Sequence, residues 1–169
     1  MKIKRNNYAY IDGNNLYRGV KSAGWKIDFF RFRKWLSDKY GVTRAYYFIG
    51  LVPKRKDLYT LLQEAGFTLI FKEVIYDGDG KPKGNCDADF VLQSAVDVYE
   101  NNCDQQVLVT SDGDYACLVK FLKGKNKIRV VLSPSIEKMC SILLKRTNVP
   151  ITYLTDVKNK IELKRKSPH

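Results

Sequence analysis

The chain has 169 residues, 44% of them hydrophobic, which suits one globular domain with a hydrophobic core and argues against disorder. Its 30 Lys and Arg outnumber 18 Asp and Glu, and the resulting formal net charge of +12 predicts attraction to a polyanion. No apolar run is long enough for a membrane span, and the N-terminus lacks the apolar stretch of a signal peptide. The four cysteines form no Cys-x-x-Cys pair and the one histidine is His169, so we expect free thiols in the cytoplasm rather than a zinc site.

Apolar segments that favour β-strands alternate along the chain with segments of helical period. The predicted strands are residues 8–11, 44–49, 67–71, 107–110, 128–132 and 151–154. The predicted helices begin near Asn14, Asp28, Pro53, Asp87, Gly113 and Pro134. In the last predicted helix, apolar residues recur with a period of 3.6 residues as far as Leu144. We assign residues 1–157 to one domain and residues 158–169 to a basic tail that we expect to fray.

Strands that alternate with helices are typical of an α/β fold, in which a mostly parallel sheet of five to six strands is covered on both faces. Ligands of such sheets bind beyond the carboxyl ends of the strands, at the point where strand order reverses. If strands 8–11 and 107–110 are neighbours, the residues that follow them meet at that point.

Acidic residues lie where a strand should end or a helix should begin. Asp12 follows the first strand, Asp87 opens a helix, and Asp112 and Asp114 follow the fourth strand. Each also has a purely structural explanation, because Asp commonly caps a turn or a helix. Asp87 and Asp89 are two residues apart and do not share a helix face, so we expect one of them, Asp87 by preference, to point toward the crevice.

Several carboxylates in one crevice repel each other unless a cation neutralises them. Oxygen ligands without His or Cys predict Mg²⁺ or Mn²⁺. Such an ion lowers the pKa of a bound water and neutralises charge on a phosphoryl oxygen, which makes a histidine base unnecessary. The sequence is compatible with one ion or two.

Three sequence blocks contain these acids: residues 10–16 (Tyr-Ile-Asp-Gly-Asn-Asn-Leu), 83–89 (Lys-Gly-Asn-Cys-Asp-Ala-Asp) and 109–115 (Val-Thr-Ser-Asp-Gly-Asp-Tyr). Together, and in this order, they resemble the NYN domains, a branch of the PIN-like nucleases. The resemblance spans roughly residues 8–154. It implies a PIN-like three-layer α/β/α sandwich and metal-dependent cleavage of RNA phosphodiester bonds.

The resemblance assigns the catalytic site to Asp12, Asp87, Asp112 and Asp114. The first three would hold the metal directly or through water, and Asp114 would complete or orient the site. The chain departs from the family pattern at Cys86, where an aliphatic residue is more usual.

Supporting roles are expected for other polar residues near the acids. Asn14 matches the polar residue that follows the first acid in the family, and we expect Asn14 and Ser111 to position water or a phosphate oxygen. Asp89 adds an acid beside Asp87. Asp97, further along the same helix, is expected to be a surface charge.

Basic residues occur in several clusters, and each cluster alone is typical of a solvated face. Lys54, Lys81 and Lys83 are expected to border the crevice, so they are our candidates for binding nucleic acid. Three tyrosines are also considered for stacking on bases, namely Tyr17, Tyr76 and Tyr115.

Three functions follow from these observations. The first is a cytoplasmic Mg²⁺- or Mn²⁺-dependent ribonuclease that acts on single-stranded or structured RNA, with no membrane partner and with a homodimer compatible with the sequence. The second is a non-catalytic RNA-binding module on the same fold, in which the acids are structural. The third, a phosphatase of the haloacid dehalogenase type with Asp12 as nucleophile, ranks last because Asn14 stands where a second Asp is expected.

Overall fold

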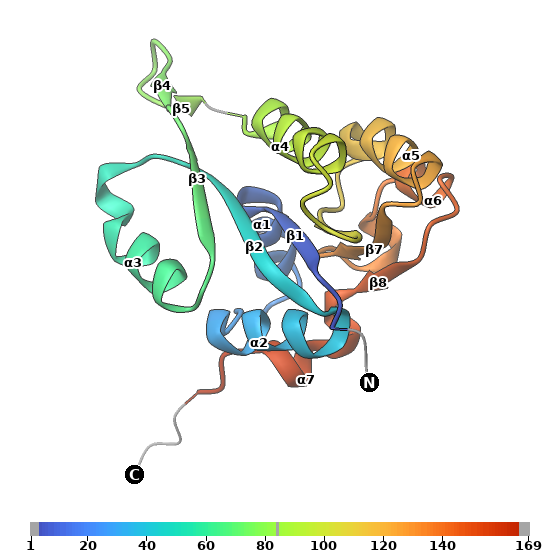
Figure 1. The fold of residues 1–169 in the computed structure, drawn as a ribbon. Coiled ribbons are helices and arrows are strands. Elements are labelled where there is room, and N and C mark those ends of the chain that lie inside the picture. The colour runs from blue at the N-terminus through green and yellow to red at the C-terminus, as the bar shows by residue number, and fades with distance from the viewer. Residues whose placement is uncertain (1–3, 84, 166–169) are drawn as a thin grey trace.

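The computed structural model describes residues 4–83 and 85–165, and its six-stranded parallel sheet confirms the predicted α/β class (Figure 1). The strand order is β3-β2-β1-β6-β7-β8. The strands are β1 (Asn7–Asp12), β2 (Val42–Gly50), β3 (Thr68–Lys72), β6 (Gln106–Val109), β7 (Ile128–Ser133) and β8 (Ile151–Tyr153). Each of the six predicted strands overlaps one of them.

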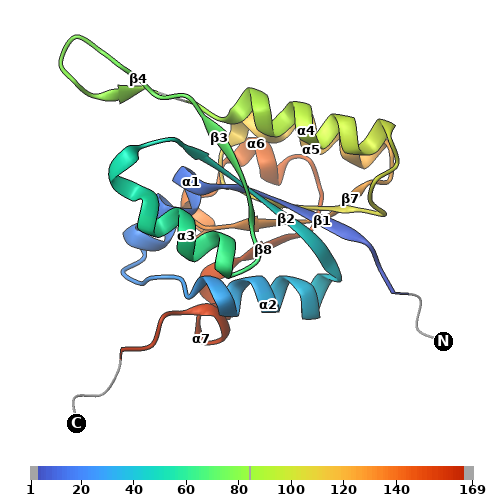
Figure 2. The same ribbon diagram turned by 60° about the vertical axis from the view of Figure 1, so that its left-hand side comes forward.

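Helices cover both faces of this sheet. The α-helices are α1 (Gly13–Ser22), α2 (Phe29–Tyr40), α3 (Lys56–Glu64), α4 (Asp87–Tyr99), α5 (Ala116–Gly124), α6 (Ile142–Lys145) and α7 (Lys158–Ile161). Short 3-10 helices are η1 (Pro53–Arg55), η2 (Gly113–Tyr115), η3 (Glu137–Met139) and η4 (Leu154–Val157). Figure 2 shows α4, α5 and α6 on one face and α2, α3 and α7 on the other, which makes a three-layer sandwich. Among the described residues, no helix is long and apolar enough to cross a membrane.

The central strand β1 is buried on both faces, as its continuous apolar sequence predicts. Ala9 and Ile11 pack in a core cluster with Leu16 of α1. The alternate residue, Tyr10, packs in a second cluster with Phe90 of α4. The sheet thus separates two hydrophobic cores, and the ends of its central strands are held firmly in place.

Strands β1 and β6 are parallel neighbours, and Ile11 lies opposite Val109. From β1 the chain moves outward through β2 and β3, and then it returns to β6 and moves outward in the other direction. Strand order therefore reverses between β1 and β6, which confirms that Asp12 and Asp112 follow neighbouring strands at the same edge of the sheet.

A two-stranded antiparallel hairpin, β4 (Ile75–Tyr76) and β5 (Pro82–Lys83), lies between β3 and α4. Figures 1 and 2 show it projecting from the body of the domain. The chain leads from this hairpin directly to the acidic start of α4.

The single helix predicted from Pro134 to Leu144 is wrong, because extended residues separate η3 from α6. The backbone N–H of Ser141 donates to the carbonyl of Ser111 at 3.2 Å, and the Ser141 hydroxyl accepts from the Leu143 amide at 3.2 Å. The apolar period of this segment resembles a helix, but a bond to the loop after β6 fixes an extended backbone at Cys140 and Ser141 instead.

The expectation that the chain frays from residue 158 is wrong for the first part of that segment. Helix α7 packs against α2, and Ile161 is 0% exposed. The carbonyl of Ile161 accepts from the Asp28 amide at 2.9 Å, and the Leu163 amide donates to Lys26 at 2.8 Å. The end of the predicted tail, residues 166–169, lies outside the described residues.

Asp97 is not the surface charge expected from its place on α4, because it is only 1% exposed. It accepts hydrogen bonds from the Tyr10 hydroxyl at 2.5 Å and from Asn102 Nδ2 at 2.9 Å. Asp97 therefore joins α4 to β1 by buried polar contacts, far from the strand ends that carry the other acids.

Candidate metal centre

Three carboxylates from two separate segments converge beyond the sheet. Asp87 is the first residue of α4, Asp112 precedes η2, and Asp114 lies within η2. Each offers one carboxylate oxygen, and the three oxygens lie within 4.8 Å of one another. Asp87 and Asp112 are half-buried and Asp114 is exposed, so the group is open to solvent on one side.

The loop after β6 is held by its own side chains. Asp112 Oδ1 accepts from the Asp114 amide at 3.0 Å, and the Asp112 amide donates to Thr110 Oγ1 at 3.1 Å. A Cβ at Gly113 would overlap Ser141 Oγ, so a larger residue here would force the Ser141 side chain to move. These contacts keep Asp112 and Asp114 side by side.

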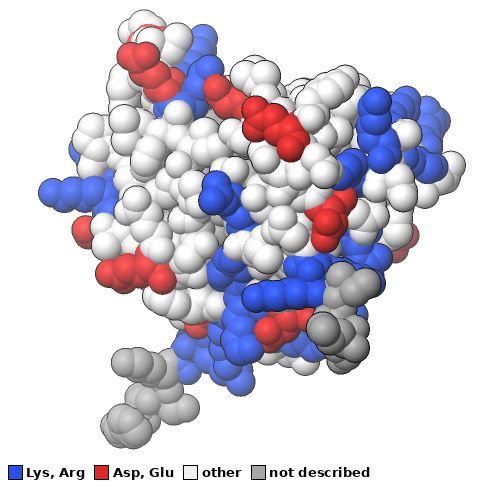
Figure 3. All heavy atoms as spheres, in the orientation of Figure 1, with Lys and Arg blue, Asp and Glu red and all other residues white. Residues whose placement is uncertain are grey.

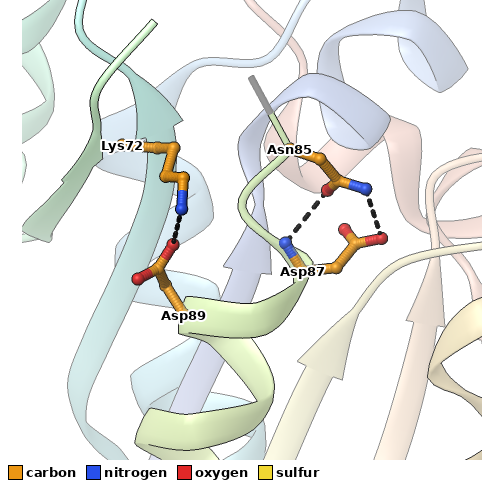
Figure 4. A network of polar contacts seen from close by, with 4 residues as sticks. All are labelled: Lys72, Asn85, Asp87 and Asp89. Carbon is orange, nitrogen blue, oxygen red and sulfur yellow. Dashed lines mark hydrogen bonds and ion pairs between the residues drawn. The ribbon is translucent and has the colours of Figure 1, made fainter. Parts of the chain in front are cut away.

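Asp87 is oriented by a neighbouring amide side chain, as Figure 4 shows. Asn85 Oδ1 accepts from the backbone N–H of Asp87 at 3.0 Å, and Asn85 Nδ2 donates to Asp87 Oδ2 at 2.8 Å. Because both ends of the Asn85 amide bind Asp87, the carboxylate is fixed at the start of α4.

Asp89 points in the other direction. Its carboxylate pairs with Lys72 Nζ of β3 at 3.3 Å, and both side chains are 40% exposed (Figure 4). Of the two acids at the start of α4, the structure thus places Asp87 in the group of three and Asp89 outside it.

The remaining predicted acid, Asp12, lies beside this group and is joined to it by Tyr115. Asp12 Oδ1 accepts from the Asn15 amide at 3.1 Å and so caps α1. The Tyr115 hydroxyl donates to Asp87 Oδ1 at 2.6 Å and lies 3.3 Å from Asp12 Oδ2. Tyr115 is 1% exposed, so the expectation that it stacks on bases is wrong.

The acids influence one another electrostatically. Burial raises the pKa of Asp12, and the nearby charges of Asp87 and Asp112 raise it further, while the Asn15 amide and the Tyr115 hydroxyl lower it. Burial, together with Asp12 and Asp87, also raises the pKa of Tyr115, which therefore remains a neutral donor. A site that concentrates negative charge in this way is stabilised by a cation.

Ser111 and Asn15 connect the two strand ends. Asn15 Oδ1 accepts from the Ser111 amide at 2.8 Å and from the Ser111 hydroxyl at 3.0 Å. Asn14, the residue singled out from the sequence, is instead exposed on the first turn of α1. Asn15 therefore supports the architecture, and Asn14 is the amide that is accessible to a ligand.

The basic and aromatic candidates lie on the periphery. Lys54 is exposed in η1, and Lys81 and Lys83 are exposed in the hairpin, where Lys83 lies 3.8 Å from Asp77. Two of the tyrosines considered for stacking, Tyr17 and Tyr76, are exposed. Contact of any of these residues with nucleic acid stays a prediction.

Three residues that position the acids were not identified from the sequence: Asn15, Asn85 and Tyr115. An Asn two residues before an Asp often forms a side-chain-to-backbone turn, which is the local signal that Asn85 offers. Tyr115 reaches Asp12 across 103 positions of sequence, so its contact has no local signal.

The donor set of Asp87, Asp112 and Asp114 fits a hard divalent cation. It consists of carboxylate oxygens only, with no nitrogen or sulfur ligand, as Mg²⁺ and Mn²⁺ prefer. Both the type of donor atom and the distances between the donors suit such a cation. The raised pKa of the adjacent Asp12 agrees, because it reflects negative charge concentrated at this place.

Comparisons with known proteins agree with this fold. The family model of the NYN domain matches residues 8–152. No curated protein matches the chain. A crystal structure of a protein of unknown function from Vibrio parahaemolyticus is similar, with a TM-score of 0.76 and 21% sequence identity over 96% of this chain and 99% of that one. At this identity the likeness shows a common fold alone.

Proposed function

The chain belongs to the NYN domain family, whose fold is that of the PIN-like nucleases, and from this premise we propose that it is a metal-dependent ribonuclease. The supporting observation is the group of three carboxylate oxygens, from Asp87, Asp112 and Asp114, within 4.8 Å of one another. The group lies at the switch point of a parallel sheet, where this class of fold binds its ligands.

In this proposal Asp87, Asp112 and Asp114 hold Mg²⁺ or Mn²⁺, and Asp12 contributes directly or through water. The bound cation would supply an activated water and neutralise charge on the phosphoryl oxygen. Asn85 and Tyr115 keep Asp87 in position, since both bind its carboxylate.

RNA is the proposed substrate because the chain is strongly basic, with a formal net charge of +12. Lys54, Lys81 and Lys83 are proposed to bind its phosphates, and exposed Asn14 to contact water or a phosphate oxygen. The Ser111 hydroxyl is already bonded to Asn15 and Ser135, so we propose that it positions the loop of Asp112.

The test is cleavage of single-stranded RNA by the purified chain with Mg²⁺ or Mn²⁺. We expect EDTA to abolish cleavage and Asp112→Asn to reduce the rate by more than about 100-fold, because both changes remove cation binding. The matched control is Asp38→Asn, the same chemical change at an exposed residue of α2 that pairs with Lys34. It should cleave as the unmodified chain does.

Cleavage that persists in EDTA, or that Asp112→Asn leaves unchanged, would contradict the proposal. Salt-sensitive RNA binding without turnover in any divalent ion, unaffected by Asp12→Asn, would instead indicate the non-catalytic RNA-binding module.

A further inference from the structure

A cleft opens beside the acidic site, between α1 and the segment that follows β7. It has a volume of about 240 Å³. Asn15 and Arg18 line it from α1, and Ser135, Ile136 and Met139 line it from the other side. Of these residues, only Asn15 hydrogen-bonds one of the acids directly.

The fold builds this cleft without a ligand. Gly19 allows α1 to approach Pro134, since a Cβ at Gly19 would lie 2.6 Å from the Pro134 Cβ. The Ser133 hydroxyl donates to the Ser135 carbonyl at 2.8 Å, and Lys145 Nζ donates to the Glu137 carbonyl at 2.7 Å. The wall opposite α1 is therefore held by hydrogen bonds at Ser135 and Glu137.

One hydrogen-bond network joins the cleft to the acidic site. Asn15, which lines the cleft, donates its backbone N–H to Asp12 and accepts from Ser111, the residue before Asp112. On the opposite wall, the Ser135 hydroxyl lies 2.9 Å from the Ser111 hydroxyl. The side chain of Asn15 therefore separates the cleft from Asp12 and from the loop of Asp112.

The lining combines a cation with an apolar surface. The four ion pairs among the described residues do not include Arg18, so its guanidinium is free to bind an anion. Met139 is 65% exposed and Ile136 is half-buried, which leaves an adaptable apolar wall opposite Arg18. A cation beside an apolar wall matches a nucleotide, whose phosphate is anionic and whose base has an apolar face.

We propose that this cleft binds the nucleotide of a single-stranded RNA next to the phosphodiester held at the acidic site. Arg18 binds a phosphate of that nucleotide, and Ile136 and Met139 contact its base. The inference rests on the proposed function and adds a binding subsite to it.

A second, more open depression extends the same path. It shares Ile136 with the cleft, and Lys138 and Lys145 line it together with one acid, Glu137. The two lysines offer a cationic surface to a further nucleotide. The RNA strand would therefore run from the acids past Arg18 toward α6.

The test measures RNA binding separately from cleavage. Affinity for a fluorescent single-stranded oligonucleotide is measured in EDTA at several salt concentrations, for Arg18→Ala and Met139→Ser. Arg18→Ala should weaken binding about tenfold and lower the slope of log K against log salt by about 0.7, because one phosphate contact is lost. Met139→Ser should weaken binding about threefold or more and leave that slope unchanged, because it removes only base contact.

Matched controls exclude a general effect of charge or hydrophobicity. Lys21→Ala removes a cation of the same helix that lies over the Tyr17 ring, and Leu92→Ser changes an exposed apolar residue of α4. Both should bind RNA as the unmodified chain does, and thermal unfolding should show all four variants folded. Arg18→Ala and Lys21→Ala with equal affinity, or no RNA binding by the unmodified chain, would overturn the proposal.

The two proposals fail in different ways. If Arg18→Ala weakens binding selectively but no divalent ion supports cleavage, the subsite stands and the ribonuclease activity is refuted. If cleavage depends on metal and Arg18→Ala matches its control, the activity stands and the subsite is refuted.

Discussion

Asp12 has a structural role in this fold, and we propose a functional role for the same side chain. Its carboxylate caps α1 through the Asn15 amide and approaches the Tyr115 hydroxyl that also binds Asp87. The cap alone would explain an Asp here, since Asn and Asp are equally good caps. Burial and the neighbouring charges of Asp87 and Asp112 raise its pKa, which costs stability while the carboxylate is charged.

We therefore expect Asp12→Asn to stabilise the metal-free protein at neutral pH. The variant keeps the cap but removes a buried charge that neighbouring acids repel, so its free energy of unfolding should be higher than that of the unmodified chain. A carboxyl whose pKa is raised on folding destabilises the native state above that pKa, and the penalty disappears as the pH falls through it toward the ordinary value of 3.8. The measurement is urea unfolding of both proteins in EDTA across this pH range.

The quantity to compare is the difference in free energy of unfolding between the two proteins, because other groups titrate in both and cancel. It should be largest at neutral pH and should shrink on acidification. An Asp12→Asn variant that is less stable than the unmodified chain at neutral pH, in EDTA, would show that the charge of Asp12 is stabilised by contacts other than a metal.

At the scale of single residues, the sequence identifies the candidate metal ligands better than it identifies the residues that hold them in place. Asp12, Asp87 and Asp112 are visible because each follows or opens a recognisable element, and the structure brings Asp87 and Asp112 together with Asp114. Asp97 was misjudged because its partner Tyr10 lies 87 positions away, on a different element. Burial of a polar residue depends on such distant partners, which local patterns do not reveal.

The elements themselves were predicted well where burial and period agree. All six strands of the central sheet were located, because β1, β6 and β7 are largely buried and give apolar runs, and the less buried edge strands β3 and β8 are still rich in β-branched and aromatic residues. The segment after β7 was not, because its apolar period favours a helix while hydrogen bonds of its residues Ser135 and Ser141 with Ser111 hold part of it extended. Tertiary contacts overrode local periodicity at the place where the sheet edge forms the site.

A substitution at Gly19 tests how tightly the segment after β7 packs on α1. We expect Gly19→Ala to destabilise the protein by about 1–2 kcal/mol, although Ala is the better helix former by about 1 kcal/mol. A Cβ there would lie 2.6–2.8 Å from three atoms of Pro134, two of them backbone atoms that cannot move aside. Chemical denaturation of the two proteins gives the difference.

Gly124, at the end of α5, is the control for this substitution. No atom lies within 4 Å of the position that its Cβ would occupy, so Gly124→Ala should be neutral or slightly stabilising. Equal effects of the two substitutions would mean that α1 and Pro134 separate without cost, and the cleft between them would then not be preformed.

For the whole molecule, the positive charge and the acidic site are separate features. Figure 3 shows Lys and Arg in several groups on one side of the protein, interspersed with Asp and Glu, and not as one continuous patch. A net charge of +12 therefore explains attraction of a polyanion from a distance but does not locate its binding site. Location depends on the acids and on the residues that border them.

Global stability reports cation binding without any assay of cleavage. A ligand that binds only the native state stabilises it by about 2.7 kcal/mol at 100 times its dissociation constant, so Mn²⁺ should raise the unfolding temperature of the chain. Asp87→Asn should lose most of this gain, because it removes a carboxylate of the group of three. Asp89→Asn should keep it, because Asp89 pairs with Lys72 outside that group. Thermal unfolding of the three proteins with increasing Mn²⁺ makes the comparison, and equal gains for both variants would show that the cation binds elsewhere.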